Sequence, residues 1–203
     1  NTRRFGASLD KIKQVVDVRD GEIMFGLNMV VHKGKTIFVG DTSVHEYPTS
    51  EQMAEIAIST ARVVRLFGFD PKVAFVSHST FGQPLTSRTK HIRNAVDILK
   101  EKKVDFEFDG DMQPDVALNP EYEELYPFSK IVGKANILIM PGQHSAAISY
   151  KMMKTLGDTK VIGPLLIGLG LPIEIAPLRS STSELINLAS IAAYSADVID
   201  YKK

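Results

Sequence analysis

The sequence predicts an α/β fold, with a mainly parallel sheet sandwiched by helices. Short apolar runs typical of buried strands alternate with longer segments whose apolar residues recur at helical spacing. Alternation of this kind favours parallel strands with helices on both faces. The 203 residues, 44% of them hydrophobic, are enough to bury a sizeable core.

The first elements are a helix and a hairpin. Phe5–Val16 carries apolar residues at helical spacing. Met24–Val31 and Thr36–Val39 are strand-like, and the intervening His32–Lys35 contains a glycine suited to a hairpin turn.

The next helix carries a start signal and a stop signal. Thr49 can cap its first turn, while Gln52, three residues on, can reach back to the amide of the cap. The apolar positions from Met53 to Phe67 follow helical spacing, and we expect the helix to end at Gly68.

A strand, a polar loop and a helix then follow each other twice. The first unit is Val73–Val76, the loop Ser77–Gly82 and a helix from about Ser87 to Lys102. The second is Ile137–Met140, the loop Pro141–Ser145 and a helix that ends near Gly157.

The C-terminal quarter contains the longest apolar stretch, Val161–Ile173. Glycines and prolines interrupt it, and it is too short to span a bilayer, so we interpret it as buried strand. Ser181 and Glu184 form a second capping box. The predicted buried stripe of this last helix is Leu185, Leu188, Ala189, Ala192 and Ala193.

The charge balance limits the partners. Lysine plus arginine (24) equals aspartate plus glutamate (24), so no overall field attracts nucleic acid or a membrane surface. The absence of cysteine excludes disulfides and thiol chemistry, and it fits a cytoplasmic location. The chain begins at Asn1 without a signal-like leader, and we expect it to be part of a longer protein.

Ligand residues are expected in the two loops, because ligands of open α/β sheets gather at the carboxyl ends of strands. Hydroxyls, free amides and glycines there suit an anion. The candidates are Ser77, Ser79, Thr80 and Gly82 in the first loop and Gly142, His144 and Ser145 in the second. Ordinary turn chemistry explains the same serines and glycines, and that alternative stays open.

No metal site is predicted. None of the five histidines forms a pair at helical i,i+4 spacing. Asp109, Asp111 and Asp115 lack the spacing of a calcium loop, and a turn followed by a helix start explains them.

A series of short motifs in this chain resembles the phosphate acetyl/butyryltransferase family, in the family's order. The motifs are Gly40–Thr42, Ser79–Gly82, Asp109–Asp115, Tyr126–Phe128, Gly133–Asn136, Ala147–Lys151, Ile162–Leu169 and Asn187–Ala189. Thr2-Arg3 and Val44–Glu46 resemble the version of the family fused behind NADP-dependent malic-enzyme domains.

The resemblance implies a two-lobed fold with a cleft between the lobes. Residues 1–203 correspond to the C-terminal part of the transferase-like domain, with a central lobe at about 21–170. It further implies a homo-oligomer and, upstream in the same chain, malic-enzyme domains that use NADP and a divalent metal. No cofactor is expected within these 203 residues.

The resemblance also locates the transferase machinery. Active relatives place a serine and an arginine before the last helix, and an aspartate in its first turn; gapless alignment places Pro177, Leu178 and Glu184 there. A further arginine position holds Thr155. Glu184 therefore remains the one catalytic candidate.

Two nearby cations bear on this loss. Arg179 lies one position from the aligned arginine, and Lys154 lies beside Thr155. Either can restore part of the positive charge but not the geometry, and the alternative that Arg179 is a surface residue stays open. Arg179, Ser180 and Arg3 complete the ligand candidates.

The leading hypothesis is a regulatory domain that binds acetyl-CoA, or a related acyl-CoA, and has lost transferase activity. Two alternatives stay open: an active phosphate acetyltransferase that uses Glu184 as base, and a module for oligomerisation alone.

Overall fold

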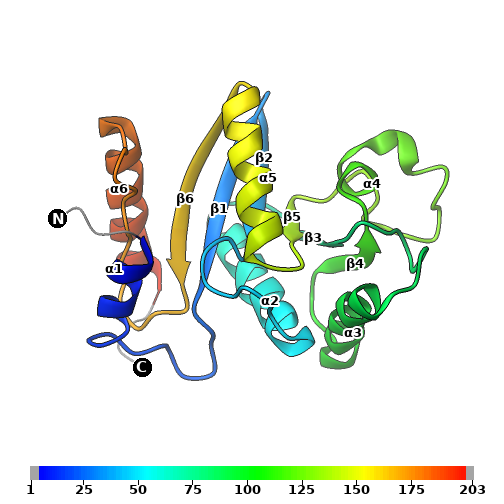
Figure 1. The fold of residues 1–203 in the computed structure, drawn as a ribbon, viewed down its shortest axis with the longest axis horizontal. Coiled ribbons are helices and arrows are strands. Elements are labelled where there is room, and N and C mark those ends of the chain that lie inside the picture. Colours follow the sequence, from blue (N-terminus) through cyan, green and yellow to red (C-terminus); the bar gives the residue numbers. More distant parts are fainter. Residues whose placement is uncertain (1–4, 200–203) are drawn as a thin grey trace.

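The computed structural model describes residues 5–199 as one six-stranded sheet with helices on both faces (Figure 1). The predicted α/β class is therefore confirmed. The elements in chain order are α1 (Phe5–Ile12), β1 (Phe25–His32), β2 (Lys35–Gly40), α2 (Ser50–Leu66), β3 (Lys72–Val76), α3 (Ser87–Lys102), β4 (Glu107–Met112), α4 (Pro114–Leu118), a 3₁₀ turn (Pro120–Tyr122), β5 (Ile137–Ile139), α5 (Gln143–Leu156), β6 (Thr159–Ile167) and α6 (Thr182–Val198).

The strand order is β4-β3-β5-β2-β1-β6. β4, β3, β5 and β2 pair in parallel, whereas β1 is antiparallel to both of its neighbours. Only β1 thus runs against the common direction, and β6 shares the direction of β5. The predicted hairpin forms β1 and β2, with Lys33 and Gly34 at positive φ in its turn.

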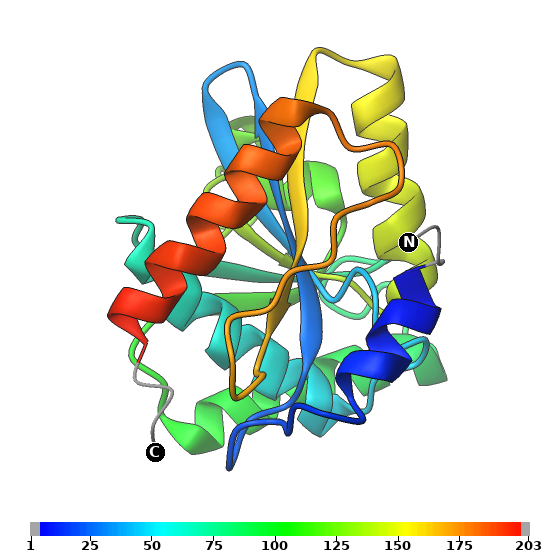
Figure 2. The same ribbon diagram turned by 90° about the vertical axis from the view of Figure 1, so that its left-hand side faces the viewer.

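The core consists of two layers of apolar side chains, one on each face of the sheet. On one face, Phe25 and Phe75 pack with Ile56 of α2 and Leu99 of α3. On the other face, the strands pack against α4 and α5, as Figures 1 and 2 show. The predicted two-sided cover is therefore present.

A smaller apolar cluster lies at the β6 side of the molecule. Leu9 of α1 packs there with Val16, Met24 and Leu169. The predicted helix to Val16 is too long: α1 ends at Ile12, and Val15 is 81% exposed. The chain turns after Ile12, and the turn brings Val16 into this cluster.

The apolar stretch Val161–Ile173 is a strand only to Ile167, which corrects the sequence prediction. Gly168 follows at φ +87°, and a Cβ there would lie 2.1 Å from the Ile23 carbonyl oxygen. This close approach requires glycine and turns the chain away from the sheet. Residues 168–181 then form an irregular segment that leads to α6.

Two further predictions are wrong. Asp109–Asp111 is not a turn but part of β4, an edge strand, which pairs with β3. Within the predicted stripe of α6, only Leu188 is buried, and Leu185 is 46% exposed. The two-lobed arrangement stays a prediction. No helix within residues 5–199 is long and apolar enough to cross a membrane.

Candidate functional site

A pocket opens between the last turns of α5 and the first turn of α6, against the first half of β6. Its volume is about 220 Å³. The lining residues are Tyr150, Lys151, Lys154, Val161, Ile162, Gly163, Pro164, Pro177, Arg179, Ser180, Glu184 and Leu188. We call it the α5–α6 pocket. Figures 1 and 2 show the C-terminal end of α5 and the N-terminal end of α6 at the same end of the molecule.

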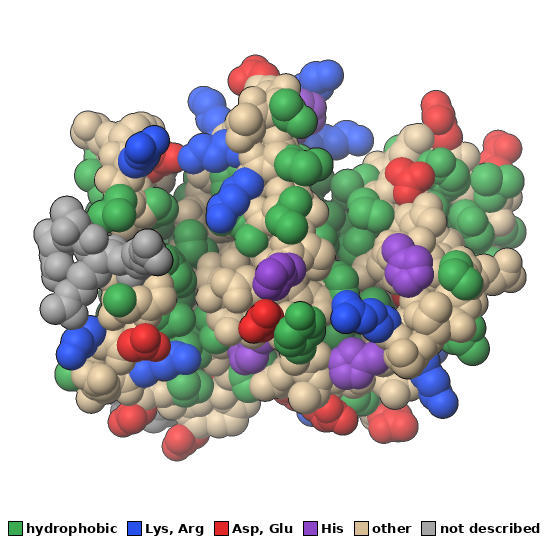
Figure 3. Space-filling model, in the orientation of Figure 1, with side chains coloured by type: hydrophobic (Ala, Val, Ile, Leu, Met, Phe, Trp, Pro, Cys, Tyr) green, Lys and Arg blue, Asp and Glu red, His purple; other side chains and the backbone are tan. Residues whose placement is uncertain are grey.

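The rim of the α5–α6 pocket is positively charged. Lys151 and Lys154 lie one turn apart on α5, near its C-terminus, where the helix dipole also favours cations. Arg179 is exposed and makes no hydrogen bond or ion pair with the residues that the structure describes. Lysine and arginine side chains gather over this end of α5 (Figure 3). With Glu184 as the only carboxylate in the lining, the rim suits an anionic ligand.

Glu184 is held by two sets of contacts. Its Oε1 accepts a hydrogen bond from Lys154 Nζ at 2.8 Å, and its Oε2 accepts from the Ser181 amide at 2.7 Å and the Ser181 hydroxyl at 3.0 Å. The predicted capping box is thus confirmed. The Lys154 contact and then the Ser181 contacts lower the pKa of Glu184 to about 2. The carboxylate is therefore a very weak proton acceptor.

The first predicted ligand loop is tied to a buried carboxylate. Asp111 is fully buried in β4; it accepts a hydrogen bond from the Ser79 hydroxyl, and its Oδ1 accepts from the Gly82 amide at 3.0 Å. Ser77 and Ser79 are buried as well, and the Ser77 hydroxyl accepts from the Ser79 amide. Thr80 lines a different recess, with Phe81 and Tyr126. The Ser79 hydroxyl and the Gly82 amide therefore hold the loop to the Asp111 carboxylate.

The second predicted loop lies at the start of α5. The Ser145 hydroxyl donates to the Gly142 carbonyl at 2.8 Å, and His144 Nε2 lies 3.4 Å from Glu46 Oε1 on the surface. A Cβ on Gly142 would lie 2.3 Å from the Glu46 carbonyl oxygen, so this glycine allows a close backbone approach.

The predicted ligand residues do not form one site. The loops follow the carboxyl ends of β3 and β5, whereas the α5–α6 pocket lies beside the amino-terminal half of β6, which runs in the same direction. The pocket is lined by Arg179, Ser180 and Glu184 and by no residue of either loop. Arg3 lies outside the described residues.

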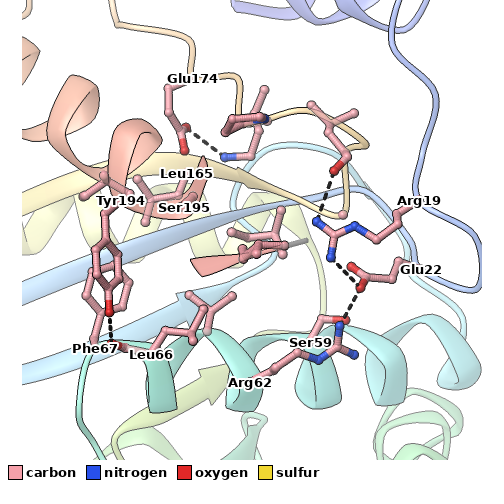
Figure 4. Close-up of a pocket in the computed structure, with 18 residues that line it drawn as sticks. Arg19, Glu22, Ser59, Arg62, Leu66, Phe67, Leu165, Glu174, Tyr194 and Ser195 are labelled. Carbon is pink, nitrogen blue, oxygen red and sulfur yellow. Dashed lines mark hydrogen bonds and ion pairs between the residues drawn. The ribbon is translucent and has the colours of Figure 1, made fainter. Parts of the chain in front are cut away.

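Sequence reasoning missed a second cavity, of about 70 Å³, between α2, α6 and the end of β6 (Figure 4). Apolar side chains such as Leu66 and Ile191 form most of its wall, and the charged side chains of Arg19, Glu22 and Arg62 also line it. Glu174 points into this cavity and accepts a hydrogen bond from the Leu166 amide at 3.0 Å. Burial raises the pKa of Glu174 to about 8. A lone glutamate in the apolar run before α6 was the available signal.

Residues 2–193 match the family described as "Phosphate acetyl/butaryl transferase". The chain belongs to this family. It is 45% identical over 195 residues to an "NADP-dependent malic enzyme" of Rhizobium meliloti (strain 1021); the alignment covers 96% of this chain and 26% of that protein. It is 32% identical over 185 residues to the "Phosphate acetyltransferase" of Bacillus subtilis (strain 168), covering 90% of this chain and 57% of that enzyme.

The solved structures agree with this assignment. A phosphotransacetylase from Streptococcus pyogenes superposes with a TM-score of 0.90 at 29% identity, over 97% of this chain and 61% of that one. EutD phosphotransacetylase from Staphylococcus aureus gives 0.84 at 28% identity, over 93% and 59%. The chain thus spans about a quarter of the malic enzymes that it matches and somewhat over half of the transferases.

Proposed function

We propose that this member of the phosphate acetyltransferase family is a regulatory domain that binds acetyl-CoA, or a related acyl-CoA, in the α5–α6 pocket without catalysing acetyl transfer. The proposal rests on the state of Glu184, which aligns with the aspartate of the active relatives. Two further features support it, the residues at the other catalytic positions and the charge of the rim.

Glu184 is a poor general base for a CoA thiol. A base works best when its pKa lies near the working pH, and a thiol has a pKa of about 8.5. The pKa of Glu184, about 2, lies far below both values, because Lys154 and Ser181 stabilise the carboxylate. The same contacts bind the side chain to the helix cap, so it serves the fold.

The other transferase positions carry no replacement group. Pro177, Leu178 and Thr155 offer no charge where the resemblance implies a serine and two arginines. The Thr155 hydroxyl donates to the Lys151 carbonyl within α5. Loss of one preorganised donor to a developing oxyanion slows a reaction about 10²- to 10³-fold, so the loss of three leaves negligible transfer even without additivity.

The rim still suits an acyl-CoA. Lys151 and Arg179 carry charges that no described acidic residue pairs with, and phosphate groups bind such cations readily. The proposal therefore retains acyl-CoA binding at the rim, while Glu184 no longer accepts a proton from the CoA thiol.

We further propose that the parent chain is a malic enzyme, whose NADP-binding and metal-binding domains lie upstream, and that acetyl-CoA inhibits it. Oxidative decarboxylation of malate yields pyruvate, a precursor of acetyl-CoA, so inhibition would be feedback. The observation that motivates this is the 45% identity to an NADP-dependent malic enzyme across 96% of the chain. A cytoplasmic homo-oligomer is part of the same proposal.

Calorimetric titration of the full-length protein with acetyl-CoA tests the binding proposal. We expect binding without release of CoA when phosphate is added, and affinity about tenfold weaker in Arg179→Ala. Lys90→Ala, which removes an exposed cation from α3, is the matched control and should bind normally. Acetyl phosphate formation at ordinary enzyme rates would establish the active transferase instead.

A module for oligomerisation alone is the second candidate function. Exposed apolar side chains on α5 and α6, among them Ile148, Leu156 and Ile186, favour it. This candidate predicts that acetyl-CoA does not raise the melting temperature, whereas a binder gains stability once the ligand exceeds its dissociation constant.

A further inference from the structure

Two buried polar groups without partners adjoin one wall of the α5–α6 pocket. Asn28, in β1, is fully buried, and neither its Nδ2 nor its Oδ1 has a hydrogen-bond partner among the described residues. The Ser180 hydroxyl oxygen is also buried and without a partner there. Native proteins keep few such groups, because an unpaired buried amide or hydroxyl destabilises the folded state. Each one therefore requires an explanation, and a ligand that pairs with it is one.

Asn28 lies opposite a bulge in the β1–β6 ladder. Leu27 pairs with Leu165 and Met29 with Ile162, so Gly163 and Pro164 lie opposite the single residue Asn28. A Cβ on Gly163 would lie 2.4 Å from Asn28 Oδ1. The carboxamide of Asn28 therefore occupies the space that a side chain at position 163 would fill.

The same bulge forms part of the pocket wall. Gly163 and Pro164 both line it, together with Ser180. Proline has no amide hydrogen, and bulged residues lack regular pairing, so few ladder bonds hold the wall in place. A shift of the bulge would open Asn28 to the pocket.

We propose that Asn28 and Ser180 form an amide-binding subsite of the α5–α6 pocket, which receives the pantetheine arm of an acyl-CoA when the Gly163–Pro164 bulge shifts. The subsite rests on the proposed function. A carboxamide offers one donor and one acceptor side by side, which matches a secondary amide of the ligand; a phosphate would leave Asn28 Oδ1 unpaired. Lys151, Lys154 and Arg179 supply the separate, cationic part of the pocket.

Two ligands and two variants of the full-length protein test the subsite. Both ligands carry adenosine and phosphates, but only acetyl-CoA carries the pantetheine amides; adenosine 3′,5′-bisphosphate lacks them. We expect Asn28→Leu and Ser180→Ala to weaken acetyl-CoA binding about tenfold, and to leave adenosine 3′,5′-bisphosphate binding unchanged. Without ligand, Asn28→Leu should melt at the same or a higher temperature, since it removes an unpaired buried amide.

The outcomes separate the two proposals. If the unsubstituted protein binds acetyl-CoA and both variants bind it equally well, the subsite is disproved and the proposed function stands. If both variants lose affinity for the two ligands alike, the subsite is also disproved, because its specificity for amides is absent. If the unsubstituted protein binds neither ligand, the proposed function fails and the subsite with it. Ser180→Ala decides the matter even if Asn28→Leu does not fold.

Discussion

At the scale of single residues, the buried Asp111 and the half-buried Glu174 have opposite environments. Asp111 receives hydrogen bonds from Ser79 and Gly82, whereas Glu174 has one amide donor in a mostly apolar cavity. Sequence reasoning identified the pocket residues Arg179, Ser180 and Glu184 through family motifs. It missed the burial of Asp111, the cavity around Glu174 and the unpaired Asn28, because burial and hydrogen bonding depend on contacts between distant strands.

Glu174→Gln should change how stability depends on pH. Since the folded-state pKa is about 8 against an ordinary 4.5, the native protein retains a proton that the unfolded chain releases. The free energy of unfolding therefore falls by up to about 1.4 kcal/mol per pH unit as the pH rises from about 4.5 to about 8. Glutamine keeps an acceptor for the Leu166 amide and does not titrate. In urea unfolding, the free energy of unfolding of the variant should rise relative to that of the original protein from pH 5 to pH 8. A difference between the two that does not change with pH would contradict the assignment.

Ser79→Ala should destabilise the fold and leave acetyl-CoA affinity unchanged. The substitution removes a hydrogen bond to the buried Asp111 carboxylate, a loss of about 2 kcal/mol. The α5–α6 pocket contains no residue of this loop. Thermal unfolding and calorimetric titration measure the two effects. A marked loss of affinity in a folded variant would show that the loop takes part in binding the ligand.

At the scale of elements, local signals predicted best where the chain caps its own helices. The capping boxes at Thr49 and Ser181 are both present, and α3 has the predicted bounds. β4 was missed because Glu107–Met112 contains three acidic residues and a glycine, and its pairing with β3 supplies the strand. The end of β6 depends on contact between Gly168 and Ile23, which lies far away in the sequence.

Thr49→Ala should lower the free energy of unfolding by about 1 kcal/mol. The Thr49 hydroxyl accepts a hydrogen bond from the Gln52 amide at 3.2 Å, at the start of the helix that fills one face of the core. Thr155→Ala, at an exposed position inside α5, is the control and should change stability little. Denaturant titration of both variants checks this; equal effects would show that the cap is unimportant.

At the scale of the whole molecule, packing is uneven. The central strands and α2 are buried from both sides, with Phe25, Phe38 and Phe75 fully covered. In contrast, α5 and α6 each bury one side chain, Ala146 and Leu188. The alternation of strands and helices predicted the layers, but the sequence does not reveal how firmly each layer is held, because the apolar residues of α5 and α6 resemble core residues.

Native-state hydrogen exchange of the 203-residue chain should reveal this difference. Amides of β2, β3 and β5 should exchange only through global unfolding, since their side chains are held by the layers on both faces. Amides of α5 and α6 should exchange at a lower opening free energy, because each helix separates from the sheet with the loss of few buried contacts. Saturating acetyl-CoA should slow exchange in the last turns of α5 and the first turns of α6, where Lys154 and Glu184 meet. Equal protection of the central strands and α6 without ligand would show that the C-terminal helix belongs to the same cooperative unit as the core.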